Sequence, residues 1–543
     1  MLELRKQGMK GAIYMGTYLN PGNGGFERIA KSGYIDKTGM IGIINSRINT
    51  ANNLICISRP RRFGKSYAAQ MLCAYYDHTC NSHNLFDDKE ISRTDCYTEH
   101  LNKYNVIYLD IAGFISDVTR QDGSIKKVVN KIADSIHSEL ISEYPELKDK
   151  TGLSDCMIAY TEITEMKFVF IIDEWDAVIR EAKDDEQTQK AYLNLLREWF
   201  KNGNFTSKAV AAAYMTGILP IKKDGFESAV SDFDEYSVLE TYEFAPYAGF
   251  TEDEVKNLCQ KYQMDFHKAK EWYDGYTFGN YHSVYNPYSV MQAMKRKTFK
   301  SYWRKTSTAE NLETLININK DGLQEDILKL IAGEQIVVNT NRFKNDFATF
   351  TSKDDVLTLL IHLGYLVYDS ETRRVRIPNE EVRFEFDDLL QNAQHTKLAE
   401  LVQASEKLLQ DTLNGKESEV VNTIVRVREM NYAPMFYNNE QALRYVIKFA
   451  YIICIDYYLK VEELPTCHGI ADVVFIPKRD TALPAMIVEL KWNETADSAI
   501  EQIKEKRYPT ILEGYFGEMV LVGINYNEKS KKHSCKIEKI NVD

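Results

Sequence analysis

The stretch NLICISRPRRFGKSYAAQMLCAYYD, residues 53–77, decides the fold of the first part of this chain. It begins with a short apolar run, passes through an arginine-rich loop, and continues with helical periodicity from residue 66 to residue 77. The phosphate-binding motif GxxxxGK[ST] lies between a buried strand and a helix, where backbone N–H groups and the helix N-terminus hold phosphates. Here Arg59 stands in place of the first glycine, and Gly64, Lys65 and Ser66 complete the motif.

The loop therefore predicts a binding site for ATP and Mg²⁺. Lys65 is expected to contact the β- and γ-phosphates, and the hydroxyl of Ser66 is a candidate Mg²⁺ ligand. The neighbouring loop residues are assigned to the same cofactor site: Arg59, Arg61, Arg62, Phe63 and Gly64. The additional arginines either add positive charge to the phosphate cradle or face solvent.

A second motif, FVFIIDEWD (168–176), supplies the acidic partners of the loop. Its apolar run predicts a buried strand with Asp173 at the carboxyl end, where a Mg²⁺-coordinating acid is needed, and Glu174 is suited to polarise the attacking water. Thr216, at the end of the apolar run 208–217, either senses the γ-phosphate or is an ordinary strand-end residue. Taken alone, each motif also fits a buried strand followed by a polar loop, but together they favour a P-loop ATPase.

The alternation of apolar and helical segments predicts an α/β fold with three domains. Residues 1–245 are expected to form a P-loop NTPase domain with a parallel sheet, because runs at 105–113, 167–176 and 208–217 alternate with amphipathic segments at 124–144 and 189–203. Residues 246–418 are expected to be mostly helical and winged-helix-like. This middle region starts at a capping box, with Thr251 and Glu254, and contains a hairpin at 364–379.

The segment IVELK (487–491) characterises the C-terminal domain, 419–543. Side chains alternate along a strand, so Glu489 and Lys491 point to one face, and the neighbouring strand-like segment 470–477 contains Asp472. Two carboxylates and a lysine on adjacent strands suit metal-dependent phosphodiester cleavage, with Asp472 and Glu489 as metal ligands and Lys491 acting on the attacking water. The element order here, a helix at 440–460, strands at 461–464, 470–476 and 485–491, a helix at 495–507 and a strand at 518–524, predicts a mixed α/β unit.

The composition narrows the class of protein further. The 543 residues carry a net charge of −12, which argues against a protein that coats nucleic acid with its whole surface. The nine cysteines form no CxxC pair, so a reducing cytoplasm is expected, without a zinc site or a disulfide framework. No apolar run reaches eighteen residues, so no membrane partner is expected.

An ordered set of motifs makes a family resemblance recognisable. These motifs are YIDKTGMI, RPRRFGKS, IIDEWDAVI, TGILPI, WYDGYTFG, YNPYSV, HLGYLV, IPNEEVR, GIADVVF, IVELKW and AIEQIKEKRY. From about residue 15 to 525, the chain resembles bacterial proteins that join an AAA-ATPase-like domain to a C-terminal nuclease-like domain of the PD-(D/E)XK superfamily. The resemblance implies that Lys65, Ser66, Asp173 and Glu174 are the ATPase positions and that Asp472, Glu489 and Lys491 are the nuclease-like triad.

The resemblance adds two accessory positions, and the chain departs from the family pattern at a third. Glu463 matches an acidic position often present in the family, and Gln502 matches a helix glutamine near the nuclease centre. The family commonly has arginine two positions before the strand acid, where this chain has Ile470.

Two functions follow as alternatives. The first is an ATPase that gates a Mg²⁺- or Mn²⁺-dependent nuclease acting on nucleic acid, with DNA expected ahead of RNA. The second is a nucleotide-controlled module that binds nucleic acid or a protein and has a silent nuclease fold. The sequence does not predict the oligomeric state.

Overall fold

The protein is described here by a computed structural model. It describes residues 16–542, except for 184, 222–229, 280, 304–311, 313, 317–320, 332, 344–349, 393–396, 432–439, 467–468, 479–480, 482 and 507–516. The chain is organised in two compact units. Unit 1 comprises Met1–Leu312 and Val337–Val382, and unit 2 comprises Glu313–Ile336 and Arg383–Asp543. The three domain boundaries expected from the sequence stay a prediction.

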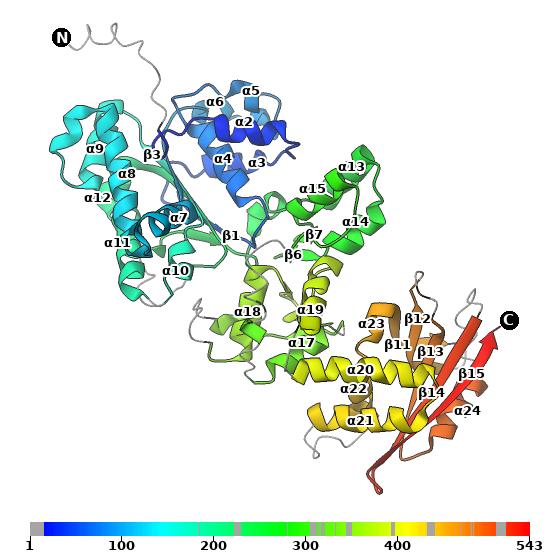
Figure 1. Cartoon of the computed structure of the whole chain (residues 1–543). Helices are drawn as coiled ribbons and strands as arrows, with labels where there is room; N and C mark the ends of the chain where they lie inside the picture. Colours follow the sequence, from blue (N-terminus) through cyan, green and yellow to red (C-terminus); the bar gives the residue numbers. More distant parts are fainter. Residues whose placement is uncertain are drawn as a thin grey trace. The chain divides into compact units, whose positions relative to one another are not determined.

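Unit 1 is built on a five-stranded parallel sheet with the order β2-β3-β4-β1-β5. Its strands β1 and β3 are labelled in Figure 1. Its strands are β1 Leu54–Ser58, β2 Asn105–Asp110, β3 Phe168–Asp173, β4 Val210–Gly217 and β5 Asp234–Tyr236. The helices around the sheet are α2 Gly24–Lys31, α3 Gly39–Asn45, α4 Lys65–Tyr76, α5 His83–Phe86, α6 Tyr97–His100, α7 Ile111–Asp122, α8 Val128–Glu143, α9 Leu153–Thr164, α10 Ala177–Glu181, α11 Glu186–Phe200 and α12 Gly203–Ala209. Short 3₁₀ helices are η1 Glu90–Arg93, η2 Ile125–Lys127, η3 Pro145–Asp149 and η5 Tyr242–Tyr247.

Both faces of this sheet are buried, which explains the continuous apolar runs in its strands. In β1, Leu54 and Cys56 join one core cluster and Ile55 and Ile57 join another, because successive side chains point to opposite faces. The predicted α/β fold with a parallel sheet is confirmed. Because the strands are parallel, the loops that follow β1, β3 and β4 emerge at the same edge of the sheet.

Unit 1 also contains two smaller modules. The first, called here the α13–α15 module, consists of α13 Glu252–Tyr262, α14 Phe266–Tyr273, β6 Tyr276–Phe278, β7 Tyr281–Val284 and α15 Pro287–Arg296. The predicted capping box opens α13, with the Thr251 side chain on the Glu254 backbone and the Glu254 side chain on the Thr251 backbone. The second contains η7 Thr340–Arg342, α18 Lys353–Leu363 and the hairpin β9 Val367–Asp369 and β10 Arg374–Arg376. This hairpin lies within the predicted range 364–379.

Unit 2 contains a five-stranded mixed sheet with the order β11-β12-β13-β14-β15 (Figure 1). Its strands are β11 Tyr458–Thr466, β12 Gly469–Pro477, β13 Ala485–Trp492, β14 Gly517–Asn527 and β15 Lys532–Val542. Only the β13–β14 pair is parallel among the pairings of these strands. The helices of unit 2 are α17 Leu323–Ile331, α20 Lys397–Leu413, α21 Glu417–Asn431, α22 Glu440–Ala450, α23 Cys454–Tyr457 and α24 Ala496–Glu505. Two elements span unit boundaries: β8 Ile336–Val337 and α19 Glu380–Asn392.

In unit 2 one prediction is wrong and one strand was not predicted. The predicted helix 440–460 is wrong beyond Ala450, since α23 is a single turn and β11 already begins at Tyr458. Burial alternates there, with Tyr458 buried and Leu459 exposed, as expected for an edge strand. The strand β15 was not expected from the sequence, because its many charged residues mask the alternation of a solvent-facing edge strand.

Two further findings concern the cysteines and the helices. Every cysteine that the structure describes is a free thiol. Within the described parts of the chain, no helix combines the length and apolarity needed to cross a membrane.

Candidate functional site

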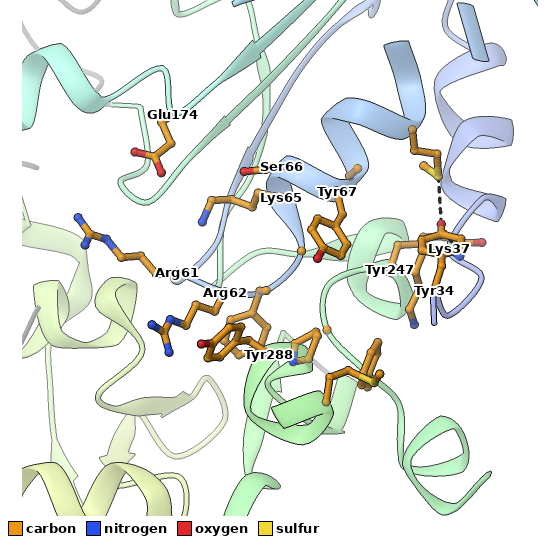
Figure 2. A pocket seen from close by; sticks show the side chains of 18 of the residues that line it. Tyr34, Lys37, Arg61, Arg62, Lys65, Ser66, Tyr67, Glu174, Tyr247 and Tyr288 are labelled. Atoms are coloured by element: carbon orange, nitrogen blue, oxygen red, sulfur yellow. Dashed lines mark hydrogen bonds between the residues drawn. The ribbon is translucent and has the colours of Figure 1, made fainter. Parts of the chain in front are cut away.

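The residues of the phosphate loop line a cavity of about 690 Å³ in unit 1. Lys65 and Ser66 form the first turn of α4, and Gly64 precedes them in the left-handed conformation with φ +84°. A glycine is favoured there because other residues are strained at that φ. Glu174 lines the same cavity and lies near Lys65 and Ser66 (Figure 2). The turn after β1 and the turn after β3 therefore meet as predicted.

The acidic side of the site is held by a short hydrogen-bond network. The Thr216 hydroxyl donates to Asp173 Oδ1 at 2.5 Å, and the Ser66 side chain lies close to the same carboxylate. Burial raises the pKa of Asp173, while the hydrogen bonds from Ser66 and Thr216 and the charge of Lys65 act in the opposite direction. The site thus brings a hydroxyl and a carboxylate together beside the phosphate loop.

Lys65 is folded back onto its own loop. Its Nζ donates to the backbone oxygens of Arg59 and Pro60, each at 2.9 Å. Burial lowers the pKa of Lys65 to about 8, against the opposing effect of Asp173 and Glu174. Carbonyl oxygens are weak partners for a buried ammonium, so a phosphate oxygen would be the stronger acceptor.

Ser66 and Asp173 suit a Mg²⁺ ion. Mg²⁺ prefers oxygen ligands and is usually held by one or two protein groups together with substrate phosphates. A hydroxyl at the start of α4 and a nearby buried carboxylate at the end of β3 match this donor chemistry. No cluster of three or more ligating side chains is found among the described residues, and a phosphate-bound Mg²⁺ does not require one.

The three arginines of the loop lie in different surroundings. Arg59 is 1% exposed, donates through Nη1 to the oxygens of Ser58 and Tyr236, and does not line the cavity. Arg62 lines the cavity but donates through Nη1 to the oxygen of Tyr302 at 2.6 Å. Its guanidinium carbon also lies 4.1 Å from the ring centre of Tyr288 (Figure 2). Arg61 lines the cavity on the side of Glu174.

The far part of the cavity is lined mostly by apolar and aromatic side chains, together with Lys37, which is paired with Glu254 (Figure 2). Phe63 packs edge-on against Tyr276 and Phe278 of the α13–α15 module. The remaining apolar lining includes Tyr34, Met40, Met71, Tyr247, Tyr288 and Met291. Sequence reasoning did not assign these residues to the site, since they come from segments up to about 250 positions apart. A cavity with a cationic end and an aromatic end fits a molecule with phosphates and a planar base.

The carboxylates predicted in unit 2 also come together. Asp472 on β12 and Glu489 on β13 are 7% and 2% exposed, and the Asp472 N–H donates to Glu489 Oε2 at 3.4 Å. Gln502 on α24 donates to Glu489 Oε1 and accepts from Lys491 Nζ at 2.5 Å. Burial raises the pKa of Glu489 to about 8, and the charge of Asp472 contributes. Glu463 lies in β11, and its side chain is outside the described residues.

Arg444 is a residue of this site that the sequence did not indicate. Arg444 on α22 donates through Nη2 to Asp472 Oδ1 at 2.5 Å, and Asp472 Oδ2 accepts from the Leu490 N–H. A guanidinium thus contacts Asp472 although position 470 is isoleucine. The carboxylate oxygens of Asp472 and Glu489 fit a hard divalent cation in ligand type, provided that Arg444 leaves Asp472.

Comparisons with known proteins give one family match for the region of the phosphate loop and another for the region of Asp472 and Glu489. Residues 22–227 match the family model described as "Predicted AAA-ATPase", and residues 438–535 match that of the PD-(D/E)XK nuclease superfamily. A curated relative, "Uncharacterized protein in vnfD 5'region" of Azotobacter chroococcum mcd 1, is 21% identical over 518 residues, which are 92% of this chain and 93% of the relative.

Two solved structures are also similar over part of the chain. The ORC2 protein of Aeropyrum pernix, solved as ADPNP-ADP complexes, is 13% identical with a TM-score of 0.29, over 67% of this chain and 97% of that one. Cdc6p of Pyrobaculum aerophilum is 9% identical with a TM-score of 0.24, over 68% and 94%. TM-scores this low carry no conclusion about this chain. The two family models, by contrast, identify an AAA-ATPase-like domain at residues 22–227 and a PD-(D/E)XK nuclease-superfamily domain at residues 438–535 of one chain.

Proposed function

We propose that this protein binds ATP with Mg²⁺ in the cavity of unit 1 and hydrolyses it. The observation that carries the proposal is the meeting of Lys65, Ser66 and Glu174 around one cavity, with the buried Asp173 carboxylate beside Ser66. Lys65 binds phosphate oxygens, Asp173 and Ser66 hold the ion, and Glu174 accepts a proton from the attacking water. Bound Mg²⁺ neutralises charge on the phosphate oxygens.

The shape of the cavity supports a nucleotide over a simple phosphate. The aromatic and apolar side chains beyond the loop offer a surface for a planar base, with Tyr34 and Tyr247 on one side of the cavity (Figure 2). Arg59, Phe63 and Thr216 belong to the proposed site as supports, since Arg59 and Thr216 are buried and Phe63 packs on the α13–α15 module.

The experiment is to measure ATP binding and phosphate release by wild type, Lys65→Ala and Lys190→Ala. Lys190 is a matched control, because it lies on α11 in an exposed ion pair with Glu186. Lys65→Ala is expected to lose phosphate release, while Lys190→Ala retains the wild-type rate. Equal turnover in Lys65→Ala and wild type would show that ATP is not hydrolysed at this loop.

For unit 2 we propose cleavage of nucleic acid phosphodiester bonds, with DNA ahead of RNA, under the control of ATP. The match to the nuclease superfamily and the convergence of Asp472, Glu489, Lys491 and Gln502 support this activity. Asp472 and Glu489 would hold Mg²⁺ or Mn²⁺, and Lys491 would position the attacking water. A divalent ion in such a site lowers the pKa of its bound water.

A silent nuclease fold is the second candidate, and a specific observation favours it. Arg444 contacts Asp472, so a guanidinium already neutralises the first candidate metal ligand. In that case the domain binds nucleic acid or a protein without cutting it, and ATP switches this binding.

The two candidates are separated by incubating single- and double-stranded DNA and RNA with wild type, Lys491→Ala and Lys529→Ala. The assay contains Mn²⁺ and ATP, and Lys529 serves as the control because it lies in the turn between β14 and β15. The nuclease proposal requires cleavage by wild type and Lys529→Ala but not by Lys491→Ala. If all three proteins leave every substrate intact, the binding-module function stands.

A further inference from the structure

Arg180 is a cationic side chain that contacts Glu174, the candidate water-polarising glutamate. It lies on α10, lines the cavity, and its side chain is 8% exposed. Its Nη2 contacts Glu174 Oε2 at 2.9 Å, and its Nε contacts Asp176 Oδ2 at 3.2 Å. Neither the phosphate-loop motif nor the strand-acid motif includes this arginine.

Asp176 fixes the base of the Arg180 guanidinium. Asp176 is 1% exposed, and its Oδ2 also accepts from the N–H groups of Ile218 and Leu219, at 3.1 and 3.0 Å. These two residues directly follow β4, the strand that carries Thr216. The guanidinium is therefore anchored to the loop after β4 through Nε, while the Nη2 end reaches Glu174. A donor held in this way requires little reorganisation when charge develops nearby.

Three cationic side chains share this end of the cavity. Lys65, Arg61 and Arg180 all line it, and the charge of Arg180 lowers the pKa of both Lys65 and Arg61, although burial is the larger cause for each. Glu174 is the carboxylate among the lining residues that Arg180 contacts directly. Glu174 itself has a φ of +52°, a strained conformation for a residue other than glycine. The carboxylates of Asp173, Asp176 and Glu181 also lie close enough to these cations to act on their pKa values in the raising direction. The positive charge is therefore opposed by carboxylates, and the phosphates of a polyanion would compete with Glu174 for Arg180.

We propose that Arg180 contacts the γ-phosphate of bound ATP from within the same chain and releases Glu174 as it does so. This inference rests on the proposed ATP hydrolysis. Before ATP binds, the ion pair with Arg180 holds the Glu174 carboxylate away from the position of the attacking water. Once the γ-phosphate is in place, its oxygens are the stronger acceptor for the guanidinium, and the freed carboxylate turns to the water.

The chemical step then uses both side chains. The water oxygen bonds to the γ-phosphorus, and the bond between that phosphorus and the bridging oxygen to the β-phosphate breaks. The bridging oxygen keeps the electron pair and leaves as part of ADP, and the proton of the water passes to Glu174. Arg180 stabilises the negative charge on the γ-phosphate oxygens while these bonds change. Such an arginine accelerates phosphoryl transfer by about 10³- to 10⁵-fold in known systems.

The test compares wild type, Arg180→Ala, Arg180→Lys and Arg120→Ala. Arg120 is the matched control because it also forms an ion pair with a nearby aspartate, Asp117, but its side chain is 75% exposed. Three quantities are measured: ATP turnover, the separate affinities for ATP and ADP, and trapping of ADP with aluminium fluoride, which mimics the transferring phosphoryl group. Turnover in Arg180→Ala is expected to fall by at least about 100-fold. ADP affinity stays within about twofold and the trapped complex is lost.

Arg180→Lys keeps the charge without the two-pronged donor, so an intermediate turnover is expected. If circular dichroism shows that Arg180→Ala does not fold, Arg180→Lys provides the test in its place. Turnover in the folded Arg180 variants at or above the wild-type rate would overturn the inference, and so would an equal loss of ATP and ADP affinity. A wild type that binds no ATP refutes the proposed function itself, whereas failure of the inference alone leaves wild-type turnover intact.

Discussion

Arg62 connects the phosphate loop to the α13–α15 module and the segment after it, and replacing it with alanine should loosen that segment. The variant loses a hydrogen bond from a charged donor to Tyr302 O, at 2.6 Å, and a guanidinium–ring contact with Tyr288, at 4.1 Å. Such interactions contribute about 1.5–3 and about 0.5–2 kcal/mol respectively. Tyr288 is 38% exposed, so the lower ends apply to the sum. We expect the local opening free energy to fall by about 2 kcal/mol, or about 30-fold in the opening equilibrium.

Hydrogen exchange followed by mass spectrometry measures this change in the full-length protein. Peptides covering residues 287–303 should exchange about 30-fold faster in Arg62→Ala than in wild type. Arg296→Ala is the control, since its guanidinium lies 6.0 Å from the Tyr302 ring and its Nε is bonded to Gln292. Exchange in these peptides should change little in the control.

The same variant distinguishes two roles for Arg62. If Arg62 acts by connecting the loop to the α13–α15 module, Arg62→Ala should change hydrogen exchange in residues 287–303 more than it changes ATP affinity. If exchange is unchanged while ATP affinity falls by more than tenfold, Arg62 is a phosphate ligand and the reasoning from its contacts is refuted.

Three further predictions concern other parts of the chain. In Arg444→Ala, the buried Asp472 and Glu489 lose a neighbouring cation. The melting temperature of this variant in EDTA should therefore fall below that of wild type, and Mn²⁺ should restore it. An unchanged melting temperature in EDTA would mean that the Arg444–Asp472 ion pair contributes nothing to stability. Burial lowers the pKa of His362 to about 3 from 6.5, so the unfolded chain binds a proton that the folded chain does not between these values. The contribution of neutral His362 to stability should therefore be fully present above pH 6.5. The free energy of unfolding should fall by up to a few kcal/mol as the pH drops towards 3. His362→Leu should flatten this part of a pH–denaturation profile, and an unchanged profile would contradict the assigned pKa. In Gly64→Ala the added Cβ meets no atom within 4 Å, but the alanine must adopt a φ of +84°. The resulting backbone strain of about 1–2 kcal/mol should lower the rate of phosphate release. A wild-type rate would show that the loop relaxes freely.

The sequence predicted the local features of the candidate nucleotide site because they follow local rules. A strand, a loop with GKS and a helix recur in order, and Asp173 ends a fully buried strand. In a parallel sheet the carboxyl ends of strands share one edge, so the proximity of Ser66 and Asp173 could be expected. The strand order was beyond reach, since β4 lies between β3 and β1 and nothing in the local pattern specifies that neighbour.

Residues that act through long-range contacts escaped prediction. Asp176 and Arg180 are four positions apart on one helical turn, a spacing that indicates an ion pair but not its position beside Glu174. Arg444 could not be linked to Asp472 from the sequence, because the predicted helix ran on to residue 460 and gave no reason to place this residue against β12. Both arginines are revealed only by tertiary packing.

The division of the chain into units has a practical consequence for cutting the protein into parts. The chain passes between the units three times, after Leu312, Ile336 and Val382. A fragment that starts at residue 383 lacks 313–336, including α17, and removes the Glu334 partner of Lys448, whose charged groups lie 3.5 Å apart. A fragment that stops at residue 312 lacks α18 and the β9–β10 hairpin of unit 1. Single truncations therefore leave each unit incomplete, and point variants in the full-length chain are the sounder way to assign an activity to either site.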